Sequence, residues 1–170
     1  TIAEKLGHLK YSQFIQDCFY DLNIIVSKYE AEIYQYVGDE AVLTWFYKNG
    51  ILNNNCILLF FEFQKQQQSR EEYYLNKYGI YPKFKAGIHS GSIMVSEVGF
   101  IKKDLAYHGD VINTAARIQA QCNTYNVSLL ISDKLIDDVN VEGFFNLKPL
   151  GSVLFKGKQK EVTIYTLAQI

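Results

Sequence analysis

Apolar residues near the start of the chain recur at spacings of three and four, which is the period of an amphipathic helix. They predict a long helix over residues 9–29, and its apolar members are Tyr11, Phe14, Ile15, Cys18, Phe19, Leu22, Ile25 and Val26. The same period predicts a second long helix over residues 56–78. Gly79 is its expected stop, and Pro82 follows.

Alternation of apolar and polar positions predicts a hairpin between these two helices. Residues 32–37 alternate, with Ile33, Gln35 and Val37 on one face, and residues 41–47 form the expected returning strand. Gly38-Asp39 supplies the tight turn. Further strands are expected at residues 84–89, 92–98, 127–131, 144–150, 153–155 and 162–167. A third long helix is expected to end near Tyr125, and Ser132 is expected to cap a short one.

The order of these elements indicates an α+β sandwich built from hairpins and long helices. At 170 residues, we expect a single domain, 1–170, with a sizeable core. A split βαβ arrangement would begin with a strand, and none precedes the first predicted helix. Because the chain starts at Thr1 without an initiator Met, we expect a fragment that lacks an upstream strand.

Composition excludes some classes of binding partner. The net charge is −1, which argues against nucleic acid or an acidic membrane surface as a partner. Any phosphate must therefore be bound by a few placed cations. The odd number of cysteines, three, and their apolar surroundings predict reduced core residues in the cytoplasm. The longest apolar run, residues 56–61, is too short to span a bilayer.

The stretch at residues 108–117 is the main candidate for chemistry. Gly109 frees the backbone to turn, and Asp110 is a good N-cap for the following helix. Asn113 and Arg117 are four residues apart and therefore share one helix face. A guanidinium near a helix N-terminus suits an anion such as phosphate. The alternative is an ordinary amphipathic helix with two solvated polar residues.

Other candidate residues stand in turns. Asp39 in the Gly-Asp turn is a candidate Mg²⁺ ligand, although this dipeptide is also ordinary turn chemistry. Lys156 and Lys158 flank Gly157 and could contact a polyphosphate, as could Lys102. The alternative for all three lysines is solvent exposure in a turn.

Four segments, in this order, resemble the catalytic domain of class III adenylate and guanylate cyclases. They are YVGDE (36–40), AGIHSG (86–91), GDVINTAARI (109–118) and FKGK (155–158). The resemblance covers essentially the whole chain. It implies a ferredoxin-like α+β domain, without its first strand here, that works as a head-to-tail homodimer with active sites at the interface.

The resemblance also implies roles for individual residues. Asp39 matches one of two metal-binding aspartates, and the other would lie on the strand upstream of Thr1. Asn113 matches the residue that positions the ribose, and Arg117 the one that stabilises the transition state. Lys156 matches the lysine on the triphosphate, with Lys158 as its neighbour. The implied reaction is two-metal-assisted attack of the ribose 3′-hydroxyl on the α-phosphate, with Mg²⁺ or Mn²⁺, which releases pyrophosphate.

The base-reading pair departs from the family pattern. Gln35 stands where adenylate cyclases typically have Lys and guanylate cyclases have Glu, and Ala106 stands at the partner position. An amide both donates and accepts hydrogen bonds, so Gln35 suits either purine. We favour ATP over GTP because nothing guanine-specific is present. Ser96, in place of a frequent glycine, carries no functional interpretation.

Two alternatives remain open at this stage. Gln35, Ala106 and the absent aspartate are compatible with a catalytically impaired nucleotide-binding or dimerisation module of the same fold. An unrelated ferredoxin-like domain, for instance an RNA-binding one, fits less well because the net charge is close to zero and no aromatic strand motif is present. The resemblance predicts a cytoplasmic domain with no membrane contact in this segment. Domains of this family are often fused to membrane or sensor modules, so the full-length protein could carry such a module.

Overall fold

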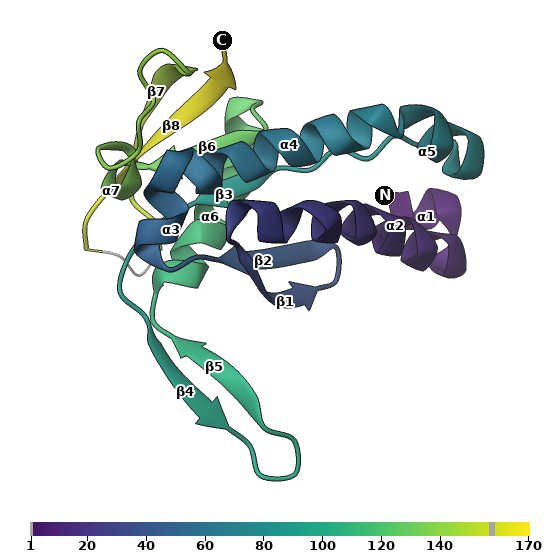
Figure 1. The fold of residues 1–170 in the computed structure, drawn as a ribbon, viewed down its shortest axis with the longest axis horizontal. Coiled ribbons are helices and arrows are strands. Elements are labelled where there is room, and N and C mark those ends of the chain that lie inside the picture. The colour runs from purple at the N-terminus through teal and green to yellow at the C-terminus, as the bar shows by residue number, and fades with distance from the viewer. Residues whose placement is uncertain (1, 157–158) are drawn as a thin grey trace. The chain divides into compact units, whose positions relative to one another are not determined.

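The computed structural model describes residues 2–156 and 159–170 (Figure 1). Their contacts group into two compact units, Thr1–Phe84 and Lys85–Ile170. Both units combine helices with antiparallel strand pairs, so the α+β class predicted from the sequence is confirmed. Within the described ranges, no helix is both long enough and apolar enough to cross a membrane.

The first unit is built from helices and one hairpin. Its elements are α1 (Ile2–Leu6), α2 (His8–Val26), the 3-10 turn η1 (Ser27–Tyr29), β1 (Glu32–Val37), β2 (Glu40–Thr44), α3 (Tyr47–Ile51), the 3-10 turn η2 (Leu52–Asn54), α4 (Asn55–Ser69) and α5 (Glu71–Tyr78). The first long helix, the hairpin and its Gly-Asp turn agree with the prediction. Gly79 ends α5 in the left-handed conformation, at φ 68°, as expected.

Three local predictions for this unit are wrong. The returning strand stops at Thr44, and Tyr47 begins a helix instead. The second long helix is interrupted at Arg70, which lies between α4 and α5. The pairing of β1 with β2 also contains a bulge between Ile33 and Gln35. The extra residue resets the alternation, so Ile33 packs against the core whereas Gln35 is exposed.

The core of the first unit lies between α2 and the helices α4 and α5. One cluster joins α2 to α4, and its buried members are Leu22, Ile25, Val26, Ala31, Leu59 and Phe63. Trp45 packs against this cluster, and its indole Nε1 donates a 2.9 Å hydrogen bond to the carbonyl of Tyr29. A second cluster joins α2 to α5 through Phe14, Cys18, Tyr74 and Tyr78.

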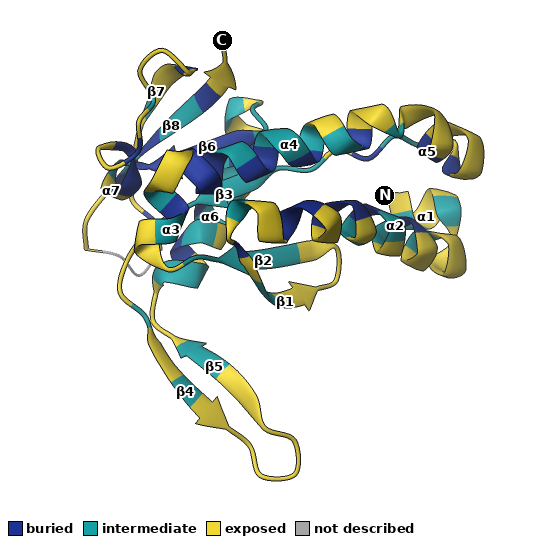
Figure 2. Ribbon diagram, viewed as in Figure 1, coloured by how far each residue is buried: buried dark blue, intermediate teal, exposed yellow. Residues whose placement is uncertain are grey.

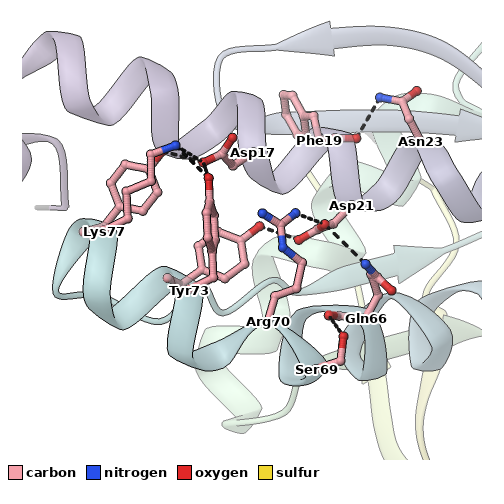
Figure 3. Close-up of polar contacts among 11 residues, drawn as sticks. Asp17, Phe19, Asp21, Asn23, Gln66, Ser69, Arg70, Tyr73 and Lys77 are labelled. Carbon is pink, nitrogen blue, oxygen red and sulfur yellow. Dashed lines mark hydrogen bonds and ion pairs between the residues drawn. The ribbon is translucent and has the colours of Figure 1, made fainter.

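A charge network, buried at Asp21 and partly exposed at Asp17, reinforces the α2–α5 contact (Figure 3). The Asp21 carboxylate is fully buried and accepts hydrogen bonds from the Tyr74 hydroxyl, at 2.5 Å, and from the Arg70 guanidinium. Asp17, one turn earlier, is bound by Lys77 at 2.9 Å and by Tyr73 at 2.8 Å. Since a buried carboxylate is tolerated only when it is paired, these contacts explain why Arg70 turns inward where α4 ends.

The second unit contains, in its described residues, a four-stranded sheet in the order β3-β6-β8-β7 and a separate hairpin, β4-β5. Its elements are β3 (Ala86–Ile88), β4 (Met94–Val98), β5 (Asp104–His108), α6 (Val111–Tyr125), β6 (Leu129–Ser132), α7 (Asp133–Ile136), β7 (Phe145–Val153) and β8 (Val162–Gln169). β3 runs parallel to β6, and the other pairs are antiparallel. β6 is buried along its whole length.

Helix α6 packs closely on the sheet at Gly87. A Cβ placed on Gly87 would overlap the main chain of Ala115 and Gln119, and it would lie 2.9 Å from the Gln119 Cα. Only glycine permits this approach of strand and helix. On the inner face of α6, Ile118 and Cys122 are fully buried in a cluster with Leu130, Phe155, Val162 and Ile164. The position of α6 on the sheet is therefore fixed by close packing of its middle turns.

The β4–β5 hairpin was not fully predicted. No strand is expected from the sequence at residues 104–108, but Asp104 begins β5, which pairs with β4 from Met94↔His108 to Val98↔Asp104. The hairpin extends beyond the four-stranded sheet (Figure 1), and most of its surface is exposed (Figure 2). Its exposed apolar side chains are Met94, Val95, Val98, Phe100, Ile101 and Leu105.

Candidate active site

Helix α6 positions Asn113 and Arg117, as the sequence predicts. Asp110 occupies the N-cap position, but it makes no side-chain cap hydrogen bond. Instead, its carbonyl accepts hydrogen bonds from the amide and the hydroxyl of Thr114, at 2.9 and 2.7 Å. Thr114 and Ile118 face inward and are fully buried. Asn113 is consequently exposed and Arg117 partly exposed, within the first two turns of the helix.

The structure brings Arg117 together with Lys156. The Arg117 guanidinium donates a 2.5 Å hydrogen bond from Nη1 to the Lys156 carbonyl oxygen. Packing explains this contact. Ile118 follows Arg117 on α6, Phe155 precedes Lys156, and both Ile118 and Phe155 belong to the same buried cluster. Lys156 itself is exposed. The other predicted lysine of this loop, Lys158, lies outside the described residues.

Asp39 lies in the first unit, in the turn between β1 and β2. Gly38 takes the left-handed conformation that the turn needs, at φ 62°. The exposed Asp39 carboxylate accepts a 2.8 Å hydrogen bond at Oδ2 from the Tyr11 hydroxyl of α2. Burial is the main cause that raises the pKa of Tyr11, and the hydrogen bond to Asp39 raises it further. This phenol therefore keeps its proton. Gln35 is exposed on β1.

Ala106 and Lys102 belong to the β4–β5 hairpin. Ala106 is partly exposed on β5 opposite Ser96. Ser96, which the sequence left without an interpretation, contacts His108 through its hydroxyl, at 2.7 Å from Nε2. It therefore links the two strands next to Ala106. Lys102 is exposed between the strands, at the end of the hairpin that lies away from α6.

The donor set fits a divalent cation only as part of a larger site. No cluster of three or more His, Cys, Asp or Glu side chains that could hold a metal occurs in the described parts of the chain. Asp39 offers one exposed carboxylate. Mg²⁺ is commonly held by one or two carboxylates together with substrate phosphates, so this carboxylate suits a cation that arrives with a nucleotide.

Comparison with known proteins identifies the family. Residues 2–169 match the model of the adenylate and guanylate cyclase catalytic domain. The chain belongs to this family. Among curated proteins it is similar to adenylate cyclase 2 of Rhizobium meliloti, at 30% identity over 98% of this chain and 46% of that protein. It is also similar to an adenylate cyclase of Anabaena cylindrica, at 25% identity over 97% of this chain and 34% of that protein. The chain thus spans less than half the length of these relatives.

Solved structures show the same fold. The adenylyl cyclase CyaB from P. aeruginosa has a TM-score of 0.81 at 18% identity, over 99% of this chain and 87% of that one. The guanylate cyclase domain of RhGC from Catenaria anguillulae, solved in complex with GTP, has a TM-score of 0.65 at 15% identity, over 91% and 81%. The class III cyclase fold predicted from the sequence is therefore confirmed.

Sequence reasoning missed one residue of this cyclase domain. Tyr11 was expected only as an apolar member of the first helix, whereas its hydroxyl binds Asp39. The two are far apart in the chain, and helical periodicity carries no signal for such a contact. The structure also gives two histidines hydroxyl partners: His108 contacts Ser96, and His89 contacts Ser132 at 2.8 Å.

Proposed function

We propose that this chain is the catalytic domain of a nucleotidyl cyclase that converts a purine nucleoside triphosphate into its 3′,5′-cyclic monophosphate and pyrophosphate. The observation that carries the proposal is the contact between Arg117 and the Lys156 loop, beside Asn113 on the same helix. It brings the main chain of Lys156 to the Arg117 guanidinium, which shares the first two turns of α6 with the Asn113 amide. Such a group suits a polyphosphate bound to a sugar.

Each of these residues has a distinct role in the proposed reaction. Asn113 holds the ribose so that the 3′-hydroxyl faces the α-phosphate, and Lys156 binds the triphosphate, with Lys158 and Lys102 as further candidate contacts. Arg117 stabilises the charge that develops on the α-phosphate as the 3′-oxygen bonds to it and pyrophosphate leaves. One donor placed in this way is often worth about 3 kcal/mol of barrier.

Asp39 would hold the divalent cations, Mg²⁺ or Mn²⁺, together with a second carboxylate. The cations supply charge neutralisation and lower the pKa of the attacking hydroxyl. In this proposal the active enzyme is a head-to-tail homodimer, in which Asp39 of one subunit faces Asn113, Arg117 and Lys156 of the other. The exposed apolar side chains of the β4–β5 hairpin support dimerisation, because patches of this kind mark interaction sites.

The base is read by Gln35 and Ala106 in this proposal, and ATP is favoured over GTP. Gln35 is exposed on β1 and can present its amide to either purine edge. Two of the relatives carry adenylate cyclase in their names, which supports ATP. A triphosphate substrate and three buried free thiols support a cytoplasmic location.

The test is an assay of the full-length protein with ATP and with GTP, each with Mg²⁺ and with Mn²⁺. The expected result is a cyclic monophosphate and pyrophosphate in equal amounts, identified by chromatography, with ATP turned over faster. Asp39→Asn should abolish the product. If neither nucleotide is cyclised but both bind, the chain is instead a nucleotide-binding or dimerisation module of the same fold.

A further inference from the structure

The carboxylate of Asp39 is held by a residue from a distant element. The Tyr11 hydroxyl on the first turn of α2 donates to Asp39 Oδ2 at 2.8 Å, and the two residues are 28 positions apart in the chain. An exposed aspartate in a turn ordinarily samples several rotamers. Here a phenol fixed to a helix selects one of them.

The surroundings of Tyr11 make this donor well placed. Its side chain is partly buried along an open groove that also includes Ile15, Phe19 and Gly38. Two turns further along α2, the Phe19 ring stacks on Tyr36 of β1, with the ring centroids 4.5 Å apart. Both ends of the Tyr11–Asp39 contact are thus anchored by packing of α2 against the hairpin.

We propose that Tyr11 is a positioning residue for Asp39, whose phenol holds Oδ2 and leaves Oδ1 directed to a divalent cation. This inference rests on the proposed function, in which Asp39 is a metal ligand. A partner that orients a metal ligand commonly contributes 10- to 100-fold to metal affinity or activity. Tyr11 would act through Asp39 and would not touch the nucleotide.

The test measures Mn²⁺ binding to the full-length protein by electron paramagnetic resonance, with an ATP analogue that carries an α,β-methylene bridge and therefore cannot release pyrophosphate. Tyr11→Phe removes only the hydroxyl, and we expect it to raise the dissociation constant for Mn²⁺ by about tenfold. In the assay with ATP, the same variant should require more Mn²⁺ for half-maximal activity.

Tyr73→Phe is the matched control. It removes a phenol–carboxylate hydrogen bond of the same 2.8 Å length, to Asp17 of the same helix, together with the bond that this hydroxyl accepts from Lys77. This variant should leave Mn²⁺ binding unchanged, whereas both variants should lower the melting temperature by small amounts. Asp39→Asn should remove the Mn²⁺ site that depends on Tyr11.

The outcomes separate this inference from the proposed function. If Tyr11→Phe changes only the melting temperature, or if Asp39→Asn leaves Mn²⁺ binding intact, the positioning role is overturned even when cyclic nucleotide is made. If Tyr11→Phe weakens Mn²⁺ binding but the wild type makes no cyclic nucleotide, the positioning role stands and the proposed function fails.

Discussion

The guanidinium of Arg117 lies against the main chain of Lys156, with Nη1 donating a 2.5 Å hydrogen bond to the carbonyl oxygen. The contact joins the second turn of α6 to the loop that precedes β8. Because the carbonyl is uncharged, it orients the guanidinium without neutralising it. The other donors of this planar fork therefore stay available to an anion.

Replacement of Arg117 should therefore reduce turnover strongly. We expect Arg117→Ala to lower kcat by about 100- to 1,000-fold, the usual effect of removing one donor aimed at transition-state charge. Steady-state assays of cyclic nucleotide formation measure this, and Lys148→Ala, at an exposed position of β7, is the control for loss of a positive charge. Full activity of Arg117→Ala would contradict the role given to this residue.

Gln35 should govern the choice of purine. Lys at this position can only donate a hydrogen bond and suits adenine N1, whereas Glu accepts from the N–H groups of guanine. We expect Gln35→Lys to raise the ratio of kcat/KM for ATP over GTP by about tenfold and Gln35→Glu to lower it by a similar factor, as one charged hydrogen bond allows. Gln13→Lys, at another exposed glutamine, should not move the ratio. If all three variants behave alike, Gln35 does not read the base.

The β4–β5 hairpin should contribute to the proposed dimer. Phe100 is 94% exposed, and Ile101 beside it is fully exposed. Burial of one such side chain is worth about 1.5–3 kcal/mol, so Phe100→Ser with Ile101→Ser should raise the dimer dissociation constant at least about tenfold. Sedimentation velocity over a range of concentrations measures this. Lys103→Ser, in the same loop, is the control, and an unchanged dissociation constant for the double variant would place the interface elsewhere.

Gly87 should be irreplaceable for packing of α6. An added Cβ would overlap the main chain of Ala115 and Gln119, and forced overpacking typically costs about 1–3 kcal/mol. We therefore expect Gly87→Ala to lower the free energy of unfolding by about 3 kcal/mol in a urea titration. At Gly143 an added Cβ meets open space, and only its φ of +75° opposes substitution, so Gly143→Ala should cost less. Equal losses would mean that the helix can shift away from β3.

Asp17 should make stability depend on pH in the acid range. Burial raises the pKa of this carboxyl, but hydrogen bonds from Tyr78, Lys77 and Tyr73 outweigh it, and the net pKa is lowered. The folded state therefore binds this proton less readily than the unfolded state. The stabilisation is complete above the unfolded pKa, near 3.9, and is lost as the pH falls through the lowered folded value.

Asp17→Asn should flatten this part of the profile. The free energy of unfolding, measured by urea titration at pH 7 and at pH 3.5, should fall less between the two values in the variant than in the wild type. Asp137→Asn, at an exposed position after α7, should keep the wild-type slope. An unchanged slope in Asp17→Asn would assign the acid sensitivity to other carboxylates.

Periodicity predicted the helices and strands that are determined by their own local sequence. β1 and α6 were placed correctly because their apolar spacing is regular and Gly-Asp stands before β2 and before α6. The interruption at Arg70 could not be read in this way, because it depends on a contact with Asp21 from another helix. β5 was missed because Asp104 and Lys103 read as loop, although cross-strand pairing with β4 makes the segment a strand.

The same distinction between local sequence and tertiary packing applies to the candidate site. Asn113 and Arg117 could be found from their spacing on one helix, and Asp39 from its turn. The bond from Arg117 to Lys156 and the bond from Tyr11 to Asp39 depend on tertiary packing and left no sequence signal.

The position of Trp45 makes it a fluorescent probe of unfolding of the first unit. It is the one tryptophan of the chain, and it is packed against the cluster that joins α2 to α4 with its indole bound to Tyr29. Fluorescence excited selectively at the indole therefore follows the loss of this core of the first unit. When such a melting curve is compared with one from circular dichroism, coincident transitions would mean that the two units unfold as one cooperative body.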